Sequence, residues 1–229
     1  MRQLLSLALV LSVASVAMAG GGIGETSYNW SIPAGGIAIP DALPAGISVD
    51  VVVNDNIDMA GAADNCVEVT LTFGGPAGRH TWIGDLSASL TKVGDGTSFL
   101  FNRIGRTSGS TGFGDTSDAI GPYTFTNKAP AGDIWAAAAA ETTGTQPVPA
   151  GAYRATNTSA VTNSAPPLDL CAPFLAGGSI GTWRLTVADL AGGDTGNLMS
   201  ASLTLKPEPS TLALLGLGAL GLIRRRRVA

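Results

Sequence analysis

Hydrophobic and polar residues alternate along five stretches of the chain with the two-residue period of a β-strand. In each stretch, polar residues separate apolar side chains such as Val67, Val69 and Leu71. Each strand therefore has one dry and one solvated face, as antiparallel sheets require. The five stretches are 49–54, 67–73, 86–91, 182–187 and 199–205, and shorter strands are predicted near 28–32, 98–102 and 123–126.

Turn signals rich in glycine separate these strands, and no long helical period interrupts them. The clearest turns are Gly74-Gly75-Pro76, Gly94-Asp95-Gly96 and Gly192-Gly193-Asp194. The run Ala136–Ala140 favours a helix but is only about one turn long. Many short strands punctuated by turns are typical of two packed sheets. We therefore expect an all-β fold, a jelly-roll-like antiparallel β-sandwich.

The N-terminal segment 1–19 has the pattern of a secretory signal peptide. Arg2 supplies a positive charge, 4–13 is an almost unbroken apolar run, and Ala17-Met18-Ala19 supplies small residues before Gly20. This order predicts export and cleavage between Ala19 and Gly20. The alternative is a buried helix at the start of the domain.

The C-terminal segment combines a short apolar run with a basic end. An apolar helix over 211–223 would span about 20 Å, short of the roughly 30 Å hydrocarbon core of a bilayer. Arg224, Arg225, Arg226 and Arg227 would remain on the cytoplasmic side. We therefore expect an exported chain that is held transiently in the inner membrane, with Pro207-Glu208-Pro209 exposed just outside the bilayer.

Pro207-Glu208-Pro209, the apolar run and the four arginines, in that order, resemble a PEP-CTERM sorting signal. The resemblance covers 207–229. It implies an exosortase-type sorting enzyme and the secretion machinery as partners, with delivery to the surface or extracellular matrix of Gram-negative bacteria. The alternative is a plain single-pass tail anchor.

Composition and charge describe the domain between these ends, residues 20–206. It is long enough for one domain with a core of its own. The chain has 13 basic and 17 acidic residues. Without Arg2, Glu208 and the four terminal arginines, 8 basic and 16 acidic residues remain, a net charge of −8. Such an acidic domain repels phosphate backbones, so nucleic acid is not expected as a partner.

The chain has two cysteines, Cys66 and Cys171. Export places them in an oxidising compartment, where a disulfide between them is expected. The alternative is two buried free thiols. A zinc site is not expected, because there is no Cys-x-x-Cys and only one histidine.

Two further stretches resemble the P domain, also called the P/homo B domain. They are RHTWIGDLSASLT at 79–91 and GTWRLTVADLAGGDTGNLMSASLTL at 181–205, and Ile39-Pro40-Asp41 resembles the usual opening of that family. The resemblance extends over 39–205. It implies a jelly-roll β-sandwich that, in the family, usually follows a subtilisin-like protease domain and supports its folding or stability.

The chain departs from the family pattern at three places. The segment 92–97 lacks the usual proline, and Ala201 stands where the family usually has tryptophan. A long segment of low complexity, about 129–165, does not align and is expected to be a loop. These departures affect loop geometry more than the fold.

Candidate chemistry is sparse. Asp115, Asp118, Asp189 and Asp194 lie in predicted loops and could hold a structural Ca²⁺ ion, which needs six to eight oxygen ligands. The alternative is that they cap turns, and Asp85 and Asp189 are the clearest turn residues. No other cofactor is evident from the sequence.

Catalysis is not expected. Gly96-Thr97-Ser98 resembles the nucleophile motif of subtilisin-like proteases, but the single histidine, His80, falls inside the predicted strand motif, where we expect a core or edge residue. A catalytic triad also needs a base that a second acid orients.

Three function classes follow. The first is a non-enzymatic exported surface or matrix protein whose domain binds an extracellular polysaccharide or a surface protein. The second is an accessory module that assists a separate subtilisin-like protease. The third, less favoured, is a hydrolase.

Overall fold

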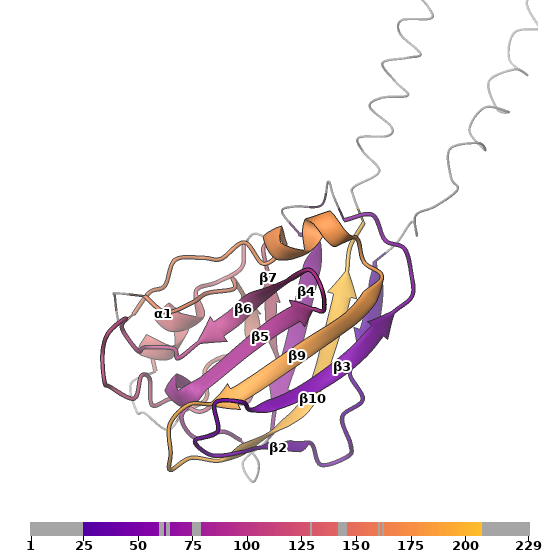
Figure 1. The fold of residues 1–229 in the computed structure, drawn as a ribbon. Coiled ribbons are helices and arrows are strands. Elements are labelled where there is room, and N and C mark those ends of the chain that lie inside the picture. The colour runs from indigo at the N-terminus through magenta and orange to yellow at the C-terminus, as the bar shows by residue number, and fades with distance from the viewer. Residues whose placement is uncertain are drawn as a thin grey trace, which may run out of the picture.

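The computed structural model describes residues 25–207 except 60, 61, 63, 64, 75–78, 129, 142–145, 160 and 162. The predicted signal peptide, and all of the sorting signal beyond Pro207, lie outside the described residues. Two β-sheets pack face to face in this part of the chain (Figure 1). The expectation of an all-β sandwich is therefore confirmed.

Six strands form the first sheet and four form the second. The first sheet has the order β1-β10-β4-β7-β8, with β2 also paired to β10, and the second has the order β3-β9-β5-β6. The strands are β1 (Thr26–Asn29), β2 (Ile37–Ile39), β3 (Ile47–Val53), β4 (Val67–Phe73), β5 (Leu86–Lys92), β6 (Gly96–Asn102), β7 (Tyr123–Thr126), β8 (Gly151–Tyr153), β9 (Gly181–Asp189) and β10 (Gly196–Leu205). Pairing is antiparallel except between β7 and β8, which are parallel.

The five alternating stretches of the sequence correspond to β3, β4, β5, β9 and β10. The segment 129–165, expected to be a loop, contains the helix α1 (Ile134–Ala139) and the strand β8. The segment at 79–91 is not strand throughout, because the 3-10 turn η1 (Ile83–Asp85) precedes β5. His80 is fully buried but lies outside β5, and it forms only an isolated bridge to Ala119, so the expectation that it belongs to the strand is wrong.

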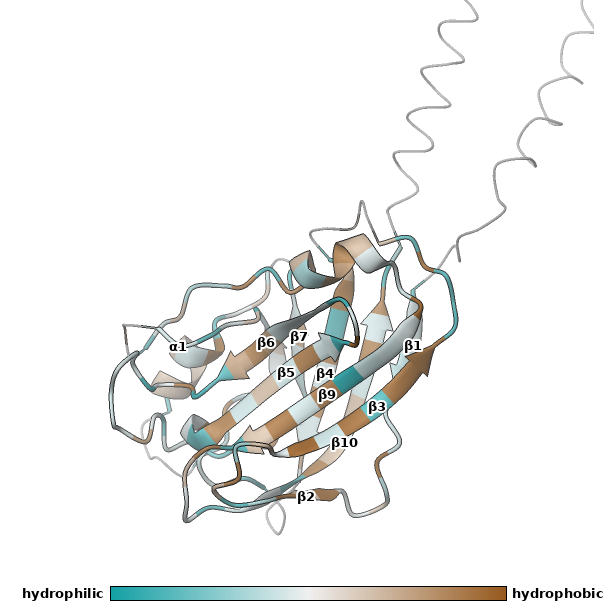
Figure 2. Ribbon diagram, in the orientation of Figure 1, coloured by the Kyte–Doolittle hydropathy of each residue, from teal (hydrophilic) through white to brown (hydrophobic). Residues whose placement is uncertain are grey.

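The core lies between the sheets and is built from alternate residues of each strand. Along β4, Val67, Val69, Leu71 and Phe73 are buried, and the residues between them are half-exposed. Figure 2 shows the same alternation of hydrophobic and hydrophilic positions along the strands. On the solvated faces, hydroxyl groups pair across strands, as between Ser48 and Thr186 at 2.9 Å.

The predicted disulfide is present. Cys66, just before β4, is bonded to Cys171, just before the 3-10 helix η2 (Ala172–Gly177), and both residues are fully buried. The Lys206 N–H donates to the Cys66 carbonyl at 2.9 Å. The disulfide therefore lies beside the end of β10.

The sandwich has two distinct ends. At one, which we call the terminal end, Thr26 pairs with Leu205 close to the disulfide, and η2 packs against Gly96 at the start of β6. At the other, the loop end, the turn 190–195 meets η1 and the segment that follows β6. Figure 1 shows that β9 and β10 run between these two ends. No described helix is long and apolar enough to cross a membrane.

Candidate functional site

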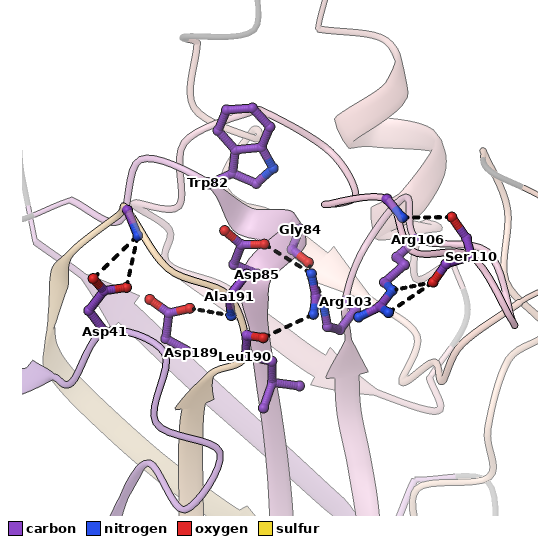
Figure 3. Close-up of polar contacts among 12 residues, drawn as sticks. Asp41, Trp82, Gly84, Asp85, Arg103, Arg106, Ser110, Asp189, Leu190 and Ala191 are labelled. Carbon is purple, nitrogen blue, oxygen red and sulfur yellow. Dashed lines mark hydrogen bonds and ion pairs between the residues drawn. The ribbon is translucent and has the colours of Figure 1, made fainter.

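Polar and charged side chains gather at the loop end of the sandwich (Figure 3). They come from η1, from the residue after β6 and the loop that follows it, and from the last residue of β9. Part of this set is buried beneath the surface, and part lines an open groove.

Arg103 holds the buried part together. It follows β6 with a φ of 49°, in the left-handed region, which turns the chain sharply at the strand end. Its guanidinium donates from Nε to the Gly84 carbonyl at 2.9 Å, from Nη1 to the Leu190 carbonyl at 3.2 Å, and from Nη2 to Asp85 Oδ1 at 3.1 Å. One side chain thus joins η1, β6 and the turn after β9.

Asp85 is the buried partner of this arginine. Its pKa is raised to about 6, chiefly by burial; the Arg103 guanidinium opposes this shift, and the nearby carboxylates of Asp189, Asp194 and Asp41 add to it. The dominant cause is the loss of water around the carboxylate, which disfavours its charged form. Asp85 is therefore a structural carboxylate with an unusually high affinity for a proton.

His80 and Asp189 form a second buried pair. His80 Nε2 lies 3.1 Å from Asp189 Oδ2, and both side chains are fully buried. The Trp82 N–H donates to His80 Nδ1 at 3.4 Å, so Nδ1 accepts and the ring proton lies on Nε2, facing Asp189. The other Asp189 oxygen accepts from the Ala191 N–H at 3.1 Å. This pair joins 79–91 to 181–205 at the loop end.

The other calcium candidates also have protein partners. Asp115 accepts from the Ser117 N–H, and Asp194 accepts from the Thr81 hydroxyl. Asp118 Oδ2 lies 3.1 Å from Arg79 Nη1, an ion pair without hydrogen-bond geometry. Across the described ranges, no group of three or more His, Cys, Asp or Glu is arranged to hold a metal ion. A calcium ion at these four aspartates stays a prediction. Asp115 and Asp189 each cap a turn through a backbone N–H two residues on, whereas Asp118 and Asp194 contact side chains far along the sequence.

The residues that resembled a nucleophile motif lie far from this cluster. Gly96, Thr97 and Ser98 begin β6 at the terminal end, where Thr97 pairs with Thr91 through their hydroxyls at 2.8 Å. His80 and Asp189 lie at the loop end. The fold therefore does not bring the serine to the histidine.

An open groove of about 540 Å³ lies beside Arg103 at the loop end. The loop 106–111 forms one wall, and Asn102, Thr158 and Leu190 contribute to the rest. The Arg106 guanidinium supports the loop from inside, because Nε and Nη2 donate to the Ser110 carbonyl at 3.0 and 2.8 Å. Across the groove, Asn102 Nδ2 donates to the Thr158 hydroxyl at 3.0 Å.

Neither this groove nor the Arg103–Asp85 pair was predicted from the sequence. A signal for the groove was present, since RIGRTSGST places two arginines and four hydroxyl residues directly after a strand. No sequence pattern indicated the Arg103–Asp85 pair, because only the pairing of β5 with β6 brings these two residues together.

Comparison with known proteins informs only the C-terminal segment. No curated protein and no solved structure matches the chain. Residues 207–227 match the PEP-CTERM protein-sorting motif. The chain therefore carries the C-terminal sorting signal of an exported protein that passes through a membrane-anchored stage and is processed by exosortase-type machinery.

Proposed function

We propose that this protein is a non-enzymatic component of the cell surface or extracellular matrix. The secretion machinery exports it, the apolar helix 211–223 holds it in the inner membrane, and an exosortase-type enzyme then processes it at Pro207-Glu208-Pro209. The observation that carries this proposal is the match of residues 207–227 to the sorting motif.

The position of the motif relative to the fold supports this order of events. Strand β10 ends at Leu205, and Lys206 is held by the Cys66 carbonyl and by an ion pair of its Nζ with Glu68 at 2.7 Å. Pro207 follows directly and cannot continue a strand. A folded domain would thus end next to the tripeptide, which stays accessible to a membrane-embedded enzyme.

We further propose that the β-sandwich is an interaction or stabilising module of the P/homo B kind. The two stretches that carry the resemblance, 79–91 and 181–205, contact each other through the β5–β9 pairing and the buried His80–Asp189 pair. His80 is the only histidine of the chain, and its complete burial supports a structural role.

The same resemblance supports a second candidate function, an accessory module that stabilises a separate subtilisin-like protease. The two candidates differ in what accompanies the mature protein. Purification of the mature protein from its host should recover a protease in stoichiometric amount only if the second candidate is correct.

Replacing Pro207-Glu208-Pro209 with three alanines tests the sorting proposal. We expect the altered protein to accumulate in the inner membrane with its tail attached, since the sorting enzyme loses its recognition sequence. Cell fractionation and intact mass of the protein provide the measurement, and the mass of the normal product also tests cleavage between Ala19 and Gly20.

Ser210→Ala is the matched control, because it changes the adjacent residue and leaves the tripeptide intact. It should be sorted normally. Release of the triple-alanine protein at the normal yield would contradict the sorting proposal.

A further inference from the structure

We propose that the groove at the loop end binds an acidic sugar, the carboxylated hexose unit of an extracellular polysaccharide. This inference names the ligand of the interaction module in the proposed function. Its test uses purified protein, so it can fail while the sorting proposal stands.

The groove carries a net positive charge. The positive charge of Arg103 is neutralised by the buried Asp85 carboxylate, whose Oδ1 lies 3.1 Å from Arg103 Nη2. Arg106 makes no ion pair with any carboxylate in the part of the chain that the structure describes, and the groove lining contains no Asp or Glu. The groove therefore carries one uncompensated positive charge inside a domain that is otherwise acidic.

Hydrogen bonds hold the Arg106 side chain in one orientation. Its Nε and Nη2 hold the Ser110 carbonyl, and within the described residues no hydrogen bond uses Nη1. A guanidinium fixed on one edge loses little freedom when its remaining donors bind a carboxylate. The side chain is thus oriented in advance for a single anionic group.

Neutral polar residues surround this charge. Five hydroxyl-bearing residues, Thr107, Ser108, Ser110, Thr111 and Thr158, line the groove together with Asn102. Each hydroxyl can both donate and accept a hydrogen bond, which suits a ligand that carries many hydroxyls of its own. One carboxylate contact among many hydroxyl contacts describes an acidic sugar better than it describes a bare inorganic anion.

The size and position of the groove fit a polymer. Its volume of about 540 Å³ falls within the usual range for small-molecule sites, and its mouth is open to solvent, so a chain can continue beyond the bound unit. Strand β10 separates the loop end from Pro207 by ten residues, or roughly 30 Å. A protein held at its C-terminal end would present the groove away from the membrane.

Titration of the purified mature protein with a galacturonic acid hexamer tests the proposal. Isothermal calorimetry and backbone amide shifts in NMR spectra should show binding, with the largest shifts in residues 102–111. A neutral glucose hexamer of the same length should bind at least tenfold more weakly. Arg106→Gln should weaken binding of the acidic hexamer at least tenfold, and Arg106→Lys should retain part of the affinity.

Two variants separate a local effect from a general one. Arg154 is exposed, lies outside the groove lining and forms no ion pair with any described residue. Arg154→Gln therefore removes a positive charge elsewhere on the surface and should leave binding unchanged. Thr111→Val removes an exposed hydroxyl of the groove without altering the Arg106 contacts and should weaken binding several-fold. It keeps the test valid if Arg106→Gln disturbs the loop.

Several outcomes would overturn the inference. Equal affinity for the neutral and acidic hexamers would show that the charge of the groove does not determine binding. Unchanged binding by both Arg106→Gln and Thr111→Val would show that the hexamer binds outside the groove. Displacement of the hexamer by an equal concentration of inorganic phosphate would show that the groove binds anions in general and does not recognise a sugar. Equal affinity for a glutamate hexamer would indicate an acidic peptide as the ligand.

Discussion

Trp183 has one of the two largest fully buried side chains among the described residues. It is fully buried on β9, its indole N–H donates to the Ser179 carbonyl at 2.8 Å, and its ring lies 5.0 Å from that of Phe174. Trp183→Ala would leave a cavity and an unpaired carbonyl, and we expect a loss of about 3 to 5 kcal/mol in the free energy of unfolding.

Thr186, on the opposite face of the same strand, is the matched control. Its hydroxyl pairs with Ser48 at the surface, so Thr186→Ala should cost no more than about 1 kcal/mol. Thermal melts of both variants provide the measurement. Similar melting temperatures for the two would show that the alternation along β9 does not separate a buried face from a solvated one.

Asp85 should make stability depend on pH. Its pKa in the folded protein is raised from 3.8 to about 6, so the folded state holds the proton more tightly than the unfolded state. This contribution is present below about pH 4 and is lost as the pH rises to about 6, by up to about 3 kcal/mol. Urea unfolding of wild-type and Asp85→Asn protein at pH 4 to 7 should show that the substitution removes this fall.

Asp50 provides a control of opposite sign. Its exposed carboxylate accepts two hydrogen bonds from Arg184, which lower its pKa, so its contribution is present at neutral pH and is lost on acidification. Asp50→Asn should therefore reduce the loss of stability on acidification and leave the fall between pH 4 and 6 intact. Identical pH profiles for wild-type and Asp85→Asn protein would contradict the assignment to Asp85.

At the scale of elements, the strands with one dry and one wet face could be predicted from the sequence. Val67–Phe73 alternates without interruption, and the structure makes it a strand with buried and half-exposed residues in strict succession. β2 and β8 have three residues each, too few to show a period, and they depend on pairing with β10 and β7. Local sequence does not determine such strands, because their partners lie far along the chain.

Only those contacts of the candidate site that join residues close together in the sequence could be predicted. The turn-capping aspartates could be anticipated, since a carboxylate that caps a turn binds a backbone N–H only a few residues away, as Asp115 does to Ser117. The groove combines 102–111 with Thr158 and Leu190, and only the packed sheets bring these together.

The disulfide joins the start of β4 to the start of η2 and closes a loop with a sequence separation of 105. Replacing Cys66 and Cys171 by serine together should lower stability by up to about 4 to 5 kcal/mol, the value of the loop-entropy model, with less expected in practice. Thermal unfolding of the double variant tests this.

Intact mass of the exported protein after alkylation, with and without reductant, tests whether the bond forms in the cell. Alkylation of both cysteines without reductant would contradict the disulfide. If the double variant had the same melting temperature as the wild-type protein, the disulfide would form without stabilising the fold.

At the scale of the whole molecule, the last strand leads to Pro207 at the terminal end of the sandwich, and the groove for which we propose a ligand lies at the loop end. The sorting signal begins at Pro207. Sorting and ligand binding should therefore be independent of each other. Arg106→Gln protein should be exported and processed at the normal yield, and fractionation of the same cells used for the triple-alanine variant provides this measurement.

The place of the disulfide has a mechanical consequence. A molecule fixed at its C-terminus and pulled at its loop end carries the tension lengthwise along β10, which lies between β1 and β4 and is therefore loaded in shear. If β10 and then β9 gave way, unravelling from Lys206 could proceed only as far as Cys171, where the covalent bond to Cys66 would take the load. The released stretch, 172–206, could extend by roughly 120 Å, and the chain beyond the disulfide would stay covalently tethered to it.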